Sequence, residues 1–106
     1  MPKFLVEASY SADGFQGLAK DKASGRKAAI ASAAKKLGGK LESIYFCMGE
    51  NDVILIVDMP DYVTAAALSA AASTAGTART NTTPLLTVEE MDKALGMSVS
   101  YRAPGK

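Results

Sequence analysis

The apolar run Val53 to Val57, inside the stretch NDVILIVDMPD, constrains the fold of this chain more than any other feature. Five apolar residues stand between Asp52 and Asp58, without the alternation of apolar and polar residues that a strand with one solvated face shows. Such a run predicts a strand that is buried on both faces. The chain has 106 residues, which we expect to form one domain, residues 1–106, with a single core. Something must therefore cover the second face of this strand.

Turn residues and β-prone stretches place the other strands. We expect four strands at residues 3–11, 40–49, 53–59 and 76–87. The stretch Gly49 to Asp52 reads as the turn of a hairpin between the second and third strands. Pro84 fits only an edge strand or a strand end, because proline cannot donate a hydrogen bond to a neighbouring strand. The fourth strand is therefore expected at an edge of the sheet.

Capping residues and apolar spacing place the helices. The first helix is expected after Ser11 and Asp13, with a kink or a restart at Ser24-Gly25 and an end at Gly38-Gly39. Its second half carries an apolar stripe with the i, i+3, i+4, i+7 spacing of a helix. We expect Pro60-Asp61 to open a second, alanine-rich helix. Thr87 and Glu90 have the spacing of a capping box and predict a short C-terminal helix.

The resulting order β-α-β-β-α-β predicts an α+β, ferredoxin-like βαββαβ fold with a four-stranded antiparallel sheet. Right-handed crossovers place both long helices on one face of this sheet and put the first and third strands at its centre. Ile54 and Ile56 would then lie on one face of the sheet, and Val53, Leu55 and Val57 on the other. A sheet face of this kind left in water would form a large apolar patch, which monomers rarely expose. We therefore expect a homodimer, or a higher even oligomer, in which two sheets pack face to face.

Composition excludes several classes of function. The net charge is +1 and the basic residues are dispersed, so we expect no nucleic-acid partner. The chain has no histidine, which removes histidine-based acid–base catalysis, histidine-ligated haem and the usual zinc sites. The single cysteine, Cys47, and the scattered carboxylates make no metal-ligand set. We expect no metal and no cofactor.

The N-terminal stretch MPKFLVEAS has its apolar run interrupted by Glu7, which is not typical of a signal peptide. No apolar run approaches the ~18 residues of a membrane-spanning helix. We therefore expect a cytoplasmic protein without a membrane partner.

Four stretches, taken in order, resemble the GYD family, whose members are functionally uncharacterised. They are KFLVEASYSADGFQGL, LGGKLESIYF, MGENDVILIVDMPD and GTARTNTTPLLTVEE. The resemblance covers almost the whole chain and implies membership of the dimeric α+β barrel superfamily, in which ferredoxin-like chains pair sheet to sheet. At the turn that gives the family its name, Gly49 and Asp52 match, whereas Asn51 stands where the family has tyrosine. Asparagine suffices for a structural turn, because it tolerates left-handed backbone; a chemical role of the tyrosine would be lost.

Three charged residues are candidates for a ligand-binding site. Arg26 lies within about 40° of Ile30 on a helical wheel, so it shares the apolar face of the first helix. There it binds an anionic group, covers apolar surface or forms an ion pair with Asp52 or Asp58. Glu7 lies in a central strand and needs a partner, because an unpaired buried charge is costly. Arg79, in the neighbouring fourth strand, is expected to supply it, unless the two residues line a ligand pocket instead.

Three further candidates complete the predicted site. Tyr10 and Tyr45 either donate phenol hydrogen bonds to a ligand or pack as structural residues. Asp52 follows the hairpin turn and either takes part in the site or hydrogen-bonds the backbone.

These residues support two hypotheses of function. In the first, the chain binds a small organic molecule, anionic if the arginines contact it, in a pocket between sheet and helices. The superfamily resemblance implies cofactor-free monooxygenase or isomerase chemistry in such a pocket. Acid–base work would then fall to Glu7, Asp52 or a tyrosine, and Arg26 and Arg79 would hold an anion, although no pair of residues at catalytic spacing is visible in the sequence. In the second, the chain is a non-enzymatic, oligomeric interaction or assembly module, and the polar residues are structural.

Overall fold

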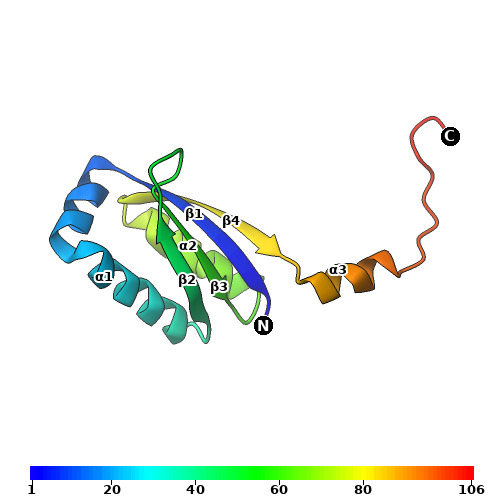
Figure 1. Cartoon of the computed structure of the whole chain (residues 1–106), viewed down its shortest axis with the longest axis horizontal. Coiled ribbons are helices and arrows are strands. Elements are labelled where there is room, and N and C mark those ends of the chain that lie inside the picture. The colour runs from blue at the N-terminus through cyan, green and yellow to red at the C-terminus, as the bar shows by residue number, and fades with distance from the viewer.

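The computed structural model describes residues 1–106. Its elements, in chain order, are β1 (Lys3–Tyr10), α1 (Ala12–Lys36), β2 (Lys40–Phe46), β3 (Val53–Asp58), α2 (Tyr62–Thr74), β4 (Ala78–Leu85) and α3 (Val88–Leu95). The four strands form one antiparallel sheet in the order β2-β3-β1-β4, and Figure 1 shows α1 and α2 on the same side of it. The predicted ferredoxin-like α+β fold with a short C-terminal helix is therefore confirmed.

The helix-facing side of the sheet carries the core. Alternate residues of the two central strands are buried there: Phe4, Val6 and Ala8 of β1, and Val53, Leu55 and Val57 of β3. Ala34 of α1 and Ala65 of α2 pack against them from the helix layer. These small side chains let each helix approach the sheet closely, so that the core between the helix layer and the sheet is well packed at these positions.

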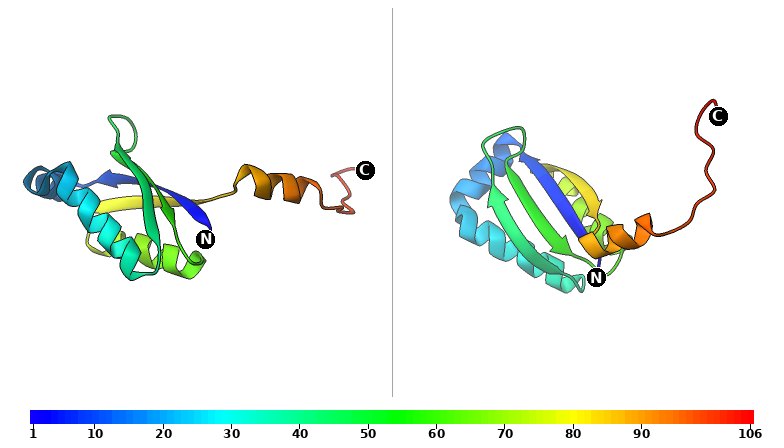
Figure 2. Two further views of the ribbon diagram at one scale, coloured as in Figure 1. Left: turned by 60° about the horizontal axis from the view of Figure 1, so that its bottom comes forward. Right: turned by 45° about the vertical axis from the view of Figure 1, so that its right-hand side comes forward.

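The opposite side of the sheet, called here the open face, has no helix over it, as the right-hand view of Figure 2 shows. Its side chains come from alternate positions of all four strands and include Leu5, Glu7, Ser9, Tyr45, Ile54, Ile56, Arg79 and Asn81. Leu5, Ile54 and Ile56 are half-buried, and Tyr45 is 69% exposed. The run Val53 to Val57 is thus covered by the chain's own helices on one face only.

Helix α1 begins as predicted but breaks at a different residue. The Ser11 side chain caps it by accepting a hydrogen bond from the Gly14 backbone N–H at 3.1 Å. The break falls at Lys22, with φ 67° and ψ 165°, two residues before Ser24-Gly25, where a kink or restart was predicted. Gly25 accommodates the break instead, because a Cβ on it would lie only 3.3 Å from the Asp21 Cβ.

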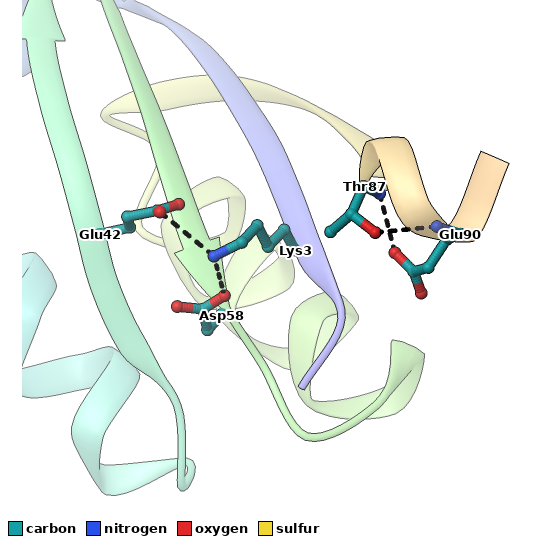
Figure 3. A network of polar contacts seen from close by, with 5 residues as sticks. All are labelled: Lys3, Glu42, Asp58, Thr87 and Glu90. Carbon is teal, nitrogen blue, oxygen red and sulfur yellow. Dashed lines mark hydrogen bonds and ion pairs between the residues drawn. The ribbon is translucent and has the colours of Figure 1, made fainter. Parts of the chain in front are cut away.

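The ends of the other helices follow the expected chemistry with one correction. Gly38 has φ 84° and stops α1, as predicted for a left-handed residue after a helix. Pro60 was expected at the first helical position, but α2 starts at Tyr62 with Asp61 as its N-cap, whose carboxylate accepts from the Thr64 N–H at 2.8 Å. The predicted capping box of α3 is confirmed and is drawn in Figure 3, where Thr87 and Glu90 exchange hydrogen bonds.

Helix α3 and the residues after it extend away from the sheet and the two long helices (Figures 1 and 2). Every residue from 88 to 106 is exposed, including Val88, Met91 and Leu95, which lie on one face of α3. None of the helices of the chain combines the length and the hydrophobicity needed to cross a membrane.

Lys3 ties three strands together at the end of the sheet opposite the hairpin turn (Figure 3). Its Nζ lies 2.8 Å from Asp58 Oδ1 on β3 and 3.2 Å from Glu42 Oε1 on β2. The hydrogen bond to Asp58 is the main reason why the pKa of Lys3 is raised above its ordinary value of 10.5. These are the two ion pairs of the structure, so no charged side chain other than Lys3, Glu42 and Asp58 takes part in an ion pair.

Candidate functional site

A cavity of about 430 Å³ lies between α1, α2 and the helix-facing side of the sheet, and is called here the helix–sheet cavity. Its walls are mostly apolar: Val6 and Leu55 from the sheet, Ile30 and Ala33 from α1, and Leu68 and Ala72 from α2. Alanines make much of the α2 wall, and their short side chains leave space that longer ones would fill. The first half of α1 lines the cavity with Gly14 and Gly17, which have no side chain. The cavity thus follows in part from the small residues of the two helices.

Arg26 contributes a positive charge to the wall of this cavity. It comes from the second half of α1 and is half-buried. No carboxylate oxygen lies within 4.0 Å of its guanidinium, so the ion pair with Asp52 or Asp58 considered from the sequence does not form. Asp13 and Asp21 also line the cavity, but both are exposed. The guanidinium is therefore available to a ligand.

Tyr10 lines the cavity at the end of β1, beside Arg26. Burial raises the pKa of its phenol above 10.0, the positive charge of Arg26 opposes this rise, and the negative charge of Asp52 adds to it. Its ring packs edge-on against Phe15 of α1, with centroids 5.6 Å apart. The Tyr10 ring is therefore fixed by packing, and its hydroxyl is an uncharged hydrogen-bond donor at neutral pH.

Asp52 fixes the hairpin turn to β1. Its Oδ2 accepts a hydrogen bond from the Tyr10 backbone N–H at 2.8 Å, and its own N–H donates to the Ala8 carbonyl at 2.8 Å. Asp52 is not among the residues that line the helix–sheet cavity. Its observed contacts are those of a backbone-binding residue, and it acts on the cavity through Tyr10, by binding the backbone N–H of that residue and by raising the pKa of its phenol.

The polar residues where α2 meets β4 satisfy one another. The Ser69 hydroxyl lies 3.0 Å from the Thr80 hydroxyl and 2.7 Å from that of Thr82. Ser69 and Thr80 line the cavity, and the hydroxyl groups of both already take part in this network. The free polar groups of the cavity are thus concentrated at the Arg26 and Tyr10 end.

The remaining candidates lie on the other side of the sheet. Glu7 Oε2 accepts a hydrogen bond from Asn51 Nδ2 at 3.0 Å, so the predicted Glu7–Arg79 ion pair is wrong. The strand register explains this, because Glu7 stands opposite Asn81 whereas Arg79 stands opposite Ser9. Asn51, the residue that replaces the family's tyrosine, therefore has a structural partner in the central strand.

Arg79 and Tyr45 complete the open-face group, and both are exposed. Of the six residues proposed from the sequence, the structure brings only Arg26 and Tyr10 together at the helix–sheet cavity, with Asp52 behind them. Asp13, Asp21 and the α2 alanines were missed as lining residues. The alanine-rich composition of α2 was the signal that could have found that wall.

The site offers hydrogen-bond donors and apolar walls. No group of three or more histidine, cysteine, aspartate or glutamate side chains is arranged to hold a metal ion. Mostly apolar walls with a few polar groups, here Arg26 and Tyr10, are typical of small-ligand sites.

The fold and this cavity define a ferredoxin-like α+β protein with a cavity between its helices and its sheet. The model of the GYD domain matches residues 4–95, so the chain belongs to the GYD family, and its fold is consistent with the dimeric α+β barrel superfamily. No match was found among curated proteins or among solved structures.

Proposed function

We propose that this protein binds a small organic molecule in the helix–sheet cavity. The observation that carries the proposal is the cavity itself, whose volume of about 430 Å³ lies within the range of small-molecule sites, roughly 300–1,000 Å³. Its apolar walls and its two free donors match what such sites offer to ligands.

Reversible binding is favoured over cofactor-free oxygenase or isomerase chemistry by the distribution of acid–base groups. Glu7 and Asp52, the carboxylates considered as catalytic from the sequence, do not line the cavity. Tyr10 does, and the other acid–base groups of the cavity, Asp13 and Asp21, are exposed. Chemistry in this site would therefore depend on Tyr10 or on these two exposed aspartates.

A fluorescent probe tests the cavity directly. N-phenylnaphthylamine (NPN) is an uncharged, apolar dye that emits strongly when it leaves water. Ala33→Phe places a ring on the cavity wall, whereas Ala29→Phe places it on the exposed side of the same helix. We expect Ala33→Phe to weaken NPN binding at least about tenfold, since a filled cavity excludes the dye, and Ala29→Phe to leave it unchanged. Equal binding by the wild type and Ala33→Phe would show that the dye sits elsewhere.

We also propose that two copies of the chain pair through their open faces. The half-buried apolar residues Leu5, Ile54 and Ile56 lie near one another on β1 and β3 of this face, where Leu5 stands opposite Ile56 and Ile54 stands opposite Glu7. Water contact with such a patch is unfavourable, and a second identical sheet would remove it with twofold symmetry. This pairing also serves the second candidate function, an assembly module, because it does not depend on the cavity.

The oligomeric state tests the pairing. Ile56→Lys puts a charge at the centre of the open face, and Ala29→Lys puts the same charge on the exposed side of α1. Native mass spectrometry and analytical ultracentrifugation should show a dimer, or a higher even oligomer, for the wild type and Ala29→Lys, and a monomer for Ile56→Lys. A monomeric wild type at micromolar concentration would refute the pairing.

A further inference from the structure

We infer that the ligand of the helix–sheet cavity is a monoanion with an apolar body, a carboxylate or sulfonate whose charged group binds Arg26 and Tyr10. The inference rests on the proposed function and adds the chemical class of the ligand. Three features of the site carry it, and they concern the charge of Arg26, the aspartates at the cavity wall and the backbone at Lys22.

The first feature is the unpaired guanidinium. Arg26 is half-buried beside apolar walls, and neither of the two ion pairs of the structure involves it. Removing a charge from water is costly unless an opposite charge or hydrogen-bond acceptors replace the water. A carboxylate or sulfonate supplies both at once, because two of its oxygens match the planar fork of the guanidinium. The Tyr10 hydroxyl, beside Arg26, is a further donor for the same group.

The second feature sets the number of charges on the ligand. Asp13 and Asp21 line the same cavity from the first half of α1 and are exposed. Their negative charges repel an anion, although solvent screens them more than it screens a half-buried group. A single negative charge held against Arg26 is balanced by that arginine, whereas a second charge would face the aspartates without a counter-charge. The site therefore favours a monoanion over a dianion such as a phosphate monoester.

The third feature is the conformation of α1. Lys22 has φ 67° and ψ 165°, a region that residues other than glycine occupy at a cost. The break lies between the two halves of α1, and both halves line the cavity, Leu18 and Asp21 before it and Arg26 and Ile30 after it. Strained backbone of this kind is concentrated where a ligand is held. The bend brings the apolar wall and the arginine to one cavity.

The apolar body of the ligand would lie along the wall formed by Val6, Leu55, Ala33 and Leu68. These residues offer no free hydrogen-bonding side chain, so a polar body would lose its water without replacement. Molecules with one acidic group and one aromatic or branched aliphatic part fit this division of the cavity.

Two dyes that differ in one charged group test the inference. Anilinonaphthalenesulfonate (ANS) carries a sulfonate, and NPN is the same ring system without it. Both are titrated against the wild type, Arg26→Gln and the matched control Lys27→Gln, which removes the same charge from the next, exposed position. We expect Arg26→Gln to raise the Kd of ANS at least about tenfold and to leave that of NPN unchanged. Lys27→Gln should leave both unchanged.

Two further measurements sharpen the result. Arg26→Lys keeps the charge but loses the planar fork, so its Kd for ANS should fall between those of the wild type and Arg26→Gln. A dianionic naphthyl phosphate should bind the wild type more weakly than naphthoate does. Far-ultraviolet circular dichroism of Arg26→Gln should match that of Lys27→Gln, which shows that both variants fold.

The outcomes separate the inference from the function on which it rests. If Ala33→Phe weakens both dyes while Arg26→Gln weakens neither, the cavity binds ligands but the anion assignment is wrong. If Ala33→Phe weakens neither dye, the cavity is not the binding site and both proposals fail. Selective weakening of ANS by Arg26→Gln, together with weakening of both dyes by Ala33→Phe, supports both.

Discussion

Adding one methyl group at Gly14 or at Gly17 should change the stability of this protein in opposite directions. Both glycines lie in the first half of α1. A Cβ on Gly14 would lie 2.1 Å from the Thr77 carbonyl oxygen and 3.1 Å from a ring carbon of Tyr10, whereas a Cβ on Gly17 would meet no heavy atom within 4 Å. The close approach at Gly14 joins the start of α1 to the chain just before β4, where the Ser11 N–H also donates to the Thr77 carbonyl at 3.0 Å.

The magnitudes follow from these distances. Replacing glycine by alanine inside a helix raises the free energy of unfolding by about 1 kcal/mol when nothing is in the way, which is the value expected for Gly17→Ala. At Gly14 the new contact is about 1.3 Å shorter than the shortest ordinary contact of 3.4 Å, and the atom in the way is backbone. Overpacking of this kind costs about 1–3 kcal/mol, and displacing Thr77 strains the bond from Ser11, worth about 1 kcal/mol more. Gly14→Ala should therefore be destabilised by a net ~2 kcal/mol.

Thermal and urea unfolding, followed by circular dichroism at equal protein concentration, measures both effects. For a domain of about 100 residues, 1 kcal/mol shifts the Tm by roughly 4–8 °C, so Gly17→Ala should melt about 5 °C above the wild type and Gly14→Ala about 10 °C below it. A Gly14→Ala variant as stable as the wild type would refute the close packing of α1 on Thr77.

Two further predictions concern α1 and the cavity. Lys22→Gly should raise the free energy of unfolding by about 1 kcal/mol because it removes strained backbone, whereas Lys27→Gly should lower it by about 1 kcal/mol, as for an unstrained helix position; urea unfolding of the pair measures the difference. Because burial raises the pKa of Tyr10 in the folded state, its contribution to stability is complete below pH 10 and is lost as pH rises through the raised pKa. The free energy of unfolding of Tyr10→Phe should therefore fall less than that of the wild type between neutral and strongly alkaline pH. The loss that remains in the variant comes from Lys3, whose pKa is also raised.

The order of elements and the division of the sheet into two faces were predictable because both depend on local periodicity. The alternation in β1 assigns Phe4 and Val6 to the core whatever their partners are. The position of the break in α1 was not predictable in this way. Glycine at position 25 suggested a break there, but the unusual backbone falls on Lys22, and glycine's role is to make room for Asp21.

Arg26 was predictable as a cavity residue because its angle on the helical wheel places it on the face that also carries Ile30. The prediction of a Glu7–Arg79 ion pair was wrong because local sequence determines the face of the sheet on which a residue lies, but not the register between two strands. Both residues do lie on the open face, but they are offset by two positions along the strands, and Glu7 instead meets Asn51, which the hairpin turn brings from 44 residues away.

The two proposed interfaces use opposite sides of the same two strands. Val6 and Leu55 face the cavity, while Leu5 and Ile54, their immediate neighbours in the chain, face outward. A strand displaced by pairing of the open faces would therefore displace a wall of the cavity as well. If the sheet is stiff, Ile56→Lys and Arg26→Gln should act independently, and their effects on ANS binding should add. A departure from additivity would show that pairing and ligand binding are coupled through β1 and β3, which would make the ligand a regulator of assembly.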